Sequence, residues 1–90
     1  MMNLTIKLLP PYLKKGAPGE YALQLDDQQI NLQQLALYLS LDWKDKFAYA
    51  LIDGKNLLTA EFLVNGKHAP LETILIDGDR VTVIPYICGG

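Results

Sequence analysis

The chain has a single cysteine, Cys88, and no long uninterrupted apolar run. A lone cysteine cannot form an intrachain disulfide, so a disulfide framework is excluded and a reducing compartment is expected. A bilayer-spanning helix would need at least about eighteen apolar residues in succession, and no such stretch is present. The segment from Met1 to Lys7 carries a charge where a signal peptide would be apolar, and Pro10 follows soon after. We therefore expect a cytoplasmic protein with no membrane partner.

Basic residues are also few and dispersed. Eight Lys and Arg stand against ten Asp and Glu, the formal net charge is −2, and Lys14 and Lys15 form the only adjacent basic pair. Nucleic acids and anionic membrane surfaces bind clustered positive charge, so this balance argues against both as partners. The chain has one histidine, its carboxylates are scattered, and it has no glycine-rich phosphate loop. The sequence therefore shows no group of residues typical of a catalytic or metal-binding site.

The polar residues that could suggest a site have simpler interpretations. His68 follows the dipeptide Asn65–Gly66, and we expect a solvated loop residue there rather than a metal ligand or a base. Asp77 and Asp79 flank a glycine, but the further ligands that a calcium loop requires are missing. We therefore expect the two aspartates to form a turn.

Alternation of apolar and polar residues predicts four strands, at Asn3–Leu9, Glu20–Asp26, Ala60–Val64 and Arg80–Pro85. Prolines and glycines between the first two strands predict an irregular loop that joins them as a hairpin. After the third strand, Asn65–Gly66 is the dipeptide that best tolerates the positive φ of a tight turn.

One helix has a complete start signal. Asn31 can cap it, Gln34 occupies the capping-box position, and Ile30 and Leu35 form a hydrophobic staple. Apolar residues then recur at helical spacing, which predicts a core helix that ends near Ser40.

A second short helix is expected after this, with Asp42 as its cap and with Trp43 and Phe47 on one face. Ala48–Ile52 could equally finish this segment in extended form. The order of elements predicts an α+β roll of the β-grasp kind, with a mixed sheet of four to five strands, the main helix across one face and the second short helix. Residues 1–90 form one domain that ends in a tail of residues 86–90.

This tail reads Tyr86, Ile87, Cys88, Gly89, Gly90. Five extended residues reach roughly 17 Å, and glycine lets a backbone enter a narrow channel. These properties suit a carboxylate that another enzyme activates, although a terminal segment without function is the common alternative.

A family resemblance spans the chain and is strongest in its last third. The sequence resembles the ubiquitin-like sulfur carriers of the MoaD/ThiS superfamily, and is most similar to the small subunit of molybdopterin synthase. The matching residues, in order, are Phe47–Leu51 before Asp53–Lys55, then Leu63–Gly66, Leu75–Val81, Ile84, Pro85, Gly89 and Gly90.

The resemblance implies a β-grasp carrier that catalyses nothing itself and binds no cofactor. A ubiquitin-activating-like (MoeB/ThiF-like) enzyme would adenylate Gly90 with ATP, and the product would become a thiocarboxylate. Gly89 and Cys88 would thread the tail into partners. The large subunit of molybdopterin synthase would then receive sulfur for a molybdenum or tungsten pterin cofactor.

Strand alternation turns Leu9, Thr82, Ile84 and Tyr86 away from the predicted core, where they could bind the partner. An equally good interpretation is that these are scattered exposed apolar residues without a binding role. Cys88 is expected to be a small tail residue with incidental reactivity, the alternative being a thiol that traps the activated carboxyl or forms a mixed disulfide with the activating enzyme.

Three other functions remain open. The same activated terminus could serve a ubiquitin-like protein modifier, or a carrier for thiamine or amino-acid biosynthesis. A noncovalent β-grasp interaction module, whose glycines have no chemical role, belongs to a different class.

Overall fold

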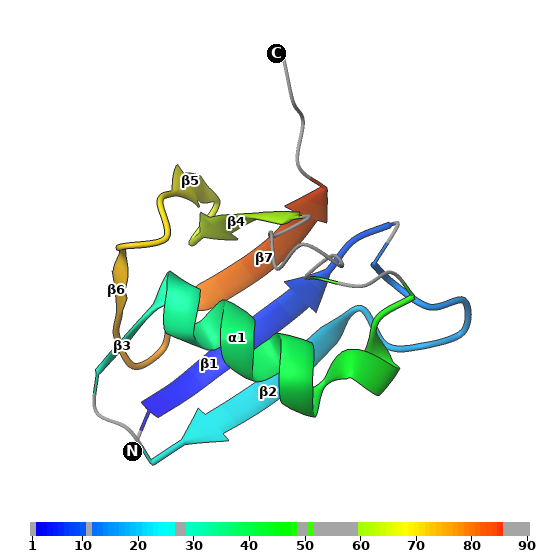
Figure 1. Ribbon diagram of the computed structural model, residues 1–90, viewed down its shortest axis with the longest axis horizontal. Coiled ribbons are helices and arrows are strands. Elements are labelled where there is room, and N and C mark those ends of the chain that lie inside the picture. Colours follow the sequence, from blue (N-terminus) through cyan, green and yellow to red (C-terminus); the bar gives the residue numbers. More distant parts are fainter. Residues whose placement is uncertain (1, 11, 27–28, 49–50, 52–59, 86–90) are drawn as a thin grey trace.

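The computed structural model describes residues 2–10, 12–26, 29–48, 51 and 60–85. Figure 1 shows one curved sheet with a helix across one of its faces. The sheet consists of β1 (Met2–Leu8), β2 (Glu20–Leu25), β4 (Ala60–Val64), β5 (Lys67–Ala69) and β7 (Arg80–Pro85). The helix is α1 (Leu32–Asp42), and β3 (Ile30–Asn31) and β6 (Ile74–Leu75) form a separate two-stranded ladder.

The five strands lie in the order β2-β1-β7-β4-β5, and β7 is therefore central. β1 pairs with β2 in an antiparallel ladder, as predicted, and with β7 in a parallel one. The antiparallel β4–β7 and β4–β5 ladders complete the sheet. This mixed five-stranded sheet with one main helix is the β-grasp arrangement that the sequence predicted.

The helix start confirms the capping prediction. The Oδ1 atom of Asn31 accepts a hydrogen bond from the backbone N–H of Gln34 at 2.8 Å, and the Oε1 atom of Gln34 accepts one from the N–H of Asn31 at 2.9 Å. The buried stripe of α1 consists of Leu32, Leu35, Ala36 and Leu39. These residues pack into one core with the inward-facing side chains of the sheet, among them Ile6, Phe62 and Val83.

The second helix differs from the prediction. Asp42 does not cap it, because α1 continues through Asp42, and the N–H of Trp43 still donates to the carbonyl of Leu39 at 3.0 Å. A short 3-10 helix, η1 (Lys44–Lys46), follows without any side-chain cap. Trp43 and Phe47 are buried, as expected for the shared apolar face. Most of the Ala48–Ile52 segment, for which an extended form was the alternative, lies outside the described residues.

Strand boundaries shift by one residue at some ends. β1 runs from Met2 to Leu8 rather than from Asn3 to Leu9, because the Leu9 carbonyl accepts hydrogen bonds from Tyr12 and Leu13 and so begins a turn. β2 ends at Leu25, one residue earlier than predicted. β4 and β7 have the predicted boundaries.

The turn after β4 has the predicted positive φ, at 53° for Asn65 and 86° for Gly66. His68 was expected in a loop, and this was wrong: it lies in β5, opposite Leu63 of β4. The tight turn reverses the chain directly into a strand, which leaves no loop for this residue. No helix in the described part of the chain is long and apolar enough to cross a membrane.

Candidate functional site

The candidate site begins at the end of β7. This strand pairs with a neighbour on each side, and its last residue, Pro85, lies opposite Ala60 of β4. The segment of residues 86–90 therefore follows directly from the centre of the sheet. The predicted tail residues Tyr86, Cys88, Gly89 and Gly90 lie outside the described residues.

The side chains of β7 alternate as predicted. Val81 and Val83 are buried beneath α1, whereas Thr82 and Ile84 are half-buried on the opposite face. Across that face, Thr82 lies between Lys7 of β1 and Leu63 of β4, and Ile84 lies opposite Glu61 of β4. We call Thr82, Ile84 and Leu63, with the charged residues around them, the exposed sheet face.

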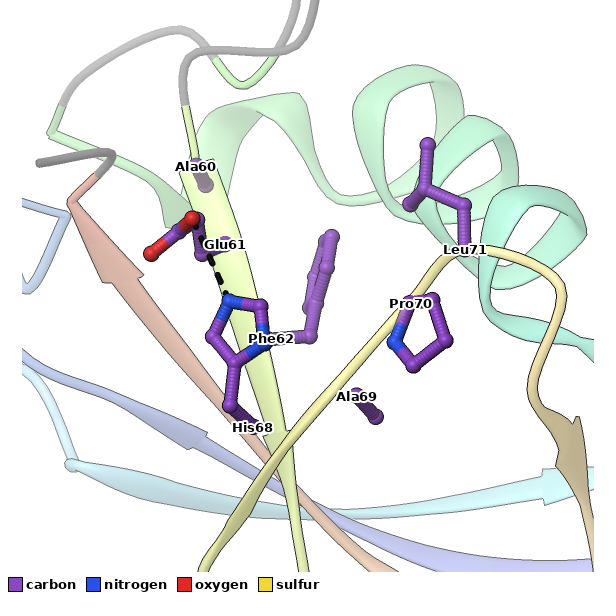
Figure 2. A pocket seen from close by; sticks show the side chains of 7 residues that line it. All are labelled: Ala60, Glu61, Phe62, His68, Ala69, Pro70 and Leu71. Atoms are coloured by element: carbon purple, nitrogen blue, oxygen red, sulfur yellow. Dashed lines mark ion pairs between the residues drawn. The ribbon is translucent and has the colours of Figure 1, made fainter. Parts of the chain in front are cut away.

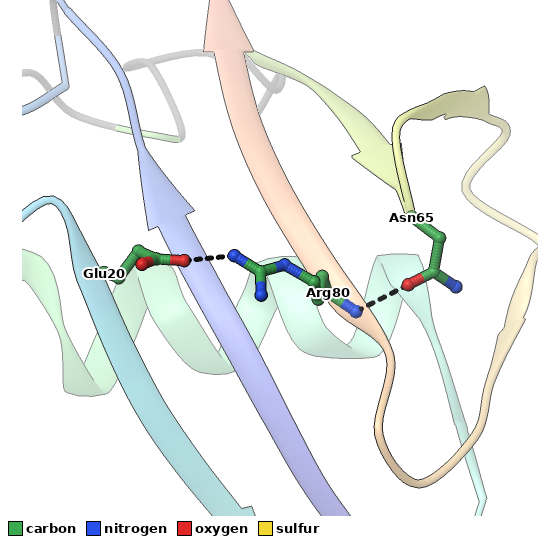
Figure 3. Close-up of polar contacts among 3 residues, drawn as sticks. All are labelled: Glu20, Asn65 and Arg80. Carbon is green, nitrogen blue, oxygen red and sulfur yellow. Dashed lines mark hydrogen bonds and ion pairs between the residues drawn. The ribbon is translucent and has the colours of Figure 1, made fainter.

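Two ion pairs border the exposed sheet face. Figure 3 shows that the guanidinium of Arg80 reaches across β1 to the carboxylate of Glu20, and their side chains are 59% and 51% exposed. On the other side, Nε2 of His68 lies 3.2 Å from Oε1 of Glu61. Exposed pairs of this kind stabilise a fold by less than about 1 kcal/mol.

A pocket of about 180 Å³ lies at the β4–β5 edge of the sheet. Figure 2 shows the Phe62 ring and the Leu71 side chain at its wall, with the His68–Glu61 pair at one rim. Because Ala60 also lines it and pairs with Pro85, one wall of the pocket lies near the end of β7. The sequence did not predict it, since its lining comes from both faces of β4 and from the turn after β5.

Leu9, the fourth residue predicted for partner binding, is half-buried just beyond β1. The two aspartates form a turn, as predicted. Oδ1 of Asp77 accepts a hydrogen bond from the N–H of Asn3 at 2.7 Å, and Oδ2 of Asp79 accepts one from the N–H of Ile76 at 2.9 Å. Among the described residues, no group of three or more His, Cys, Asp and Glu is placed to hold a metal ion.

The mixed five-stranded sheet with its helix defines a small domain of the ubiquitin-like β-grasp class, and in the sequence its central strand is followed by a segment that ends in Gly89 and Gly90. The comparison with protein families gives the particular family. Residues 16–90 match the model of the ThiS family, and the chain therefore belongs to this family. A search of curated proteins found no significant match.

Solved structures of two kinds share the fold. A crystal structure of small archaeal modifier protein 1 from Haloferax volcanii is 14% identical and has a TM-score of 0.70, with 97% of this chain and 100% of that chain covered. A Pyrococcus furiosus protein assigned as molybdopterin converting factor subunit 1 is 16% identical with a TM-score of 0.68, at 97% and 100% coverage.

The Helicobacter pylori complex of subunits 1 and 2 of molybdopterin-converting factor also contains a similar chain. It is 20% identical with a TM-score of 0.57, and 99% of this chain and 100% of that chain are covered. The predicted membership of the ThiS-like family and the predicted β-grasp fold are thus confirmed.

Proposed function

We propose that this protein is a sulfur carrier whose Gly90 carboxylate is adenylated, converted to a thiocarboxylate and used to donate sulfur in molybdopterin or tungstopterin synthesis. The observation that carries the proposal is the ThiS-family match, which extends through Gly89 and Gly90. The chain acts as a cosubstrate in the cytoplasm and performs none of these steps itself. It needs no bound cofactor, because the partner enzyme consumes the ATP.

The proposed chemistry takes place in two steps at Gly90. An oxygen of the carboxylate attacks the α-phosphorus of ATP, and pyrophosphate leaves. Hydrosulfide from the sulfur donor then attacks the carbonyl carbon of the acyl adenylate, AMP leaves, and loss of a proton gives the thiocarboxylate. Five extended residues after Pro85 reach roughly 17 Å, far enough to bring Gly90 into a partner's active site. Gly89 and Cys88 are small enough to pass through a narrow channel.

Partner docking is proposed for Leu9, Thr82, Ile84 and Tyr86, of which Thr82 and Ile84 belong to the exposed sheet face. The half-buried Thr82 and Ile84 offer apolar contact close to the start of the tail. A MoeB/ThiF-like activating enzyme would bind there first, and a large synthase subunit later. The complex of subunits 1 and 2 from Helicobacter pylori supports a partner of the second kind.

A test of this proposal is peptide-level mass spectrometry after incubation with a candidate activating enzyme, ATP and a sulfur donor. A chain without Gly90 is the matched control. Mapping to the peptide is necessary, because oxidation of Met1, Met2 or Cys88 adds nearly the mass of an oxygen-to-sulfur exchange. Sulfur on Gly90 that is absent from the control is the expected result.

Two other results would replace the proposal. Lysine conjugates of Gly90 instead of a thiocarboxylate would indicate a protein modifier, which the shared fold of small archaeal modifier protein 1 supports as the second candidate. If no cognate enzyme forms an adenylate or a thiocarboxylate, the chain is a noncovalent binding module. Sulfur transfer to a thiamine or amino-acid precursor in place of a pterin would keep the carrier and change its pathway.

A further inference from the structure

The side chain of Asn65 joins two turns at the start of β7. Its Oδ1 atom accepts a hydrogen bond from the N–H of Arg80 at 3.0 Å, and its Nδ2 atom donates one to Oδ1 of Asp79 at 2.9 Å. The other carboxylate oxygen of Asp79 is occupied by the N–H of Ile76. Asp79 is only 7% exposed, whereas Asn65 itself lies at the exposed surface, so the network joins a buried carboxylate to an exposed turn.

Asn65 is also followed by Gly66, and this sequence has a chemical consequence. The backbone nitrogen of a residue after asparagine can attack the Asn side-chain carbon Cγ, and glycine hinders this attack least because it has no side chain. The other asparagines of the chain, Asn3, Asn31 and Asn56, each precede a leucine. Asn65 is thus the asparagine most susceptible to this reaction.

We propose that Asn65 is a site of spontaneous deamidation, that the closed β4–β5 hairpin protects it, and that the product prevents the hairpin from closing normally. In the reaction, the Gly66 nitrogen attacks Cγ and ammonia leaves, which gives a cyclic succinimide. Water opens the ring to aspartate or isoaspartate. One water is consumed, one ammonia is released, and nothing is oxidised or reduced.

Protection follows from the contacts of the side-chain amide. Both of its polar atoms are held by groups on the β6–β7 side of the structure, so Cγ is not free to rotate toward the Gly66 nitrogen. Reaction requires this turn to open. The turn is bordered by β5, a strand of three residues at the edge of the sheet that pairs with β4. Short edge elements of this kind open more readily than a core.

The position of Asp79 explains why the deamidated product would oppose closure of the β4–β5 hairpin. Aspartate at position 65 would replace the donating Nδ2 group with an oxygen, and two carboxylate oxygens would then face each other where a hydrogen bond of 2.9 Å now lies. Both the lost hydrogen bond and the like-charge repulsion oppose closure, and burial of Asp79 strengthens the repulsion. Isoaspartate would in addition insert one backbone carbon into the turn and disturb the β4–β5 register.

A test measures deamidation of the full chain by peptide mass spectrometry, in native buffer and in urea. We expect Asn65 to deamidate in urea while Asn3, Asn31 and Asn56 stay intact. In the native state the rate should fall at least about tenfold, which corresponds to an opening free energy of about 1.4 kcal/mol. Equal rates in both conditions, or an intact Asn65 in urea, would overturn the proposal. Mass is the necessary readout, since isoaspartate formed at Asp77–Gly78 leaves the mass unchanged.

A second test uses an exchange of the two side chains. Asn65→Asp should lower the thermal midpoint by at least about 4 °C. The double variant Asn65→Asp, Asp79→Asn should recover most of this loss, because the amide introduced at position 79 would donate to the carboxylate introduced at position 65 and still accept from the N–H of Ile76. If the double variant is no more stable than Asn65→Asp, contact with Asp79 is not the cause of the damage and that part of the proposal fails. The rate comparison needs neither variant, so it still decides whether Asn65 is the site and whether the hairpin protects it if Asn65→Asp does not fold.

Discussion

The replacement Ile84→Asp tests whether the exposed sheet face binds the activating enzyme. Ile84 is already half-buried in the free protein, so only part of the roughly 1.5–3 kcal/mol for full burial of isoleucine remains for a partner, about 1 kcal/mol. An unpaired carboxylate placed in the contact adds a cost of about 1–3 kcal/mol. The sum of at least about 2 kcal/mol predicts that the dissociation constant rises about thirtyfold or more.

The assay is calorimetric titration of each variant with the activating enzyme, after thermal denaturation has shown that the variant is folded. Leu41→Asp is the matched control, because Leu41 is 71% exposed on α1, and α1 covers the other face of the sheet. We expect this control to bind within about twofold of the original chain, since its surface lies outside the proposed contact.

The neutral replacement Ile84→Thr separates the two contributions to this effect. It keeps a β-branched side chain in the strand and introduces no charge beside Glu61, so it should weaken binding by no more than about fivefold. A folded Ile84→Asp variant that binds as well as the original chain would refute the docking surface. Equal weakening by Leu41→Asp would show that the added charge, and not the location, determines binding.

Three further predictions concern stability and the tail. Asn31→Ala should lower the free energy of unfolding by about 1 kcal/mol in urea denaturation, because the N–H of Gln34 loses the side-chain oxygen that accepts its hydrogen bond, although the backbone N–H of residue 31 can still donate to Gln34; an unchanged midpoint would contradict this. Leu39→Ala should cost about 2–5 kcal/mol in the same assay, since the leucine is fully buried on the inner stripe of α1, and a loss below about 1 kcal/mol would show that the site collapses around the smaller residue. Cys88→Ala should leave sulfur loading of Gly90 intact in the mass-spectrometric assay, whereas a severe loss in a folded variant would assign the thiol a chemical role.

Local signals account for the elements that the sequence predicted well. The reciprocal bonds of Asn31 and Gln34 join residues three positions apart, and alternation within β7 is a property of one strand. Such features need no knowledge of the remaining fold. Asp42 was misassigned as a cap for the same reason: its side chain favours a helix start, but continued hydrogen bonding of α1 outweighs that preference.

The structural features that the sequence did not predict depend on contacts between segments far apart in the chain. β3 and β6 are two residues long, too short to show any periodicity, and exist because they pair with each other. The Arg80–Glu20 pair joins residues 60 positions apart across an intervening strand. The half-buried placement of Thr82 and Ile84 could be predicted from alternation, whereas the ion pairs and the pocket around them depend on strand order.

The central position of β7 also has a mechanical consequence. A partner that grips the chain beyond Pro85 pulls along the axis of a strand whose backbone is bonded to β1 on one side and to β4 on the other. The pulling force acts along β7 and is shared by the β1–β7 and β4–β7 ladders. The backbone hydrogen bonds of both ladders must therefore break together rather than one after another. A strand at the sheet margin would instead peel away from a single neighbour. We therefore expect the domain to stay folded when the chain beyond Pro85 is pulled, for example when a bound partner dissociates from it.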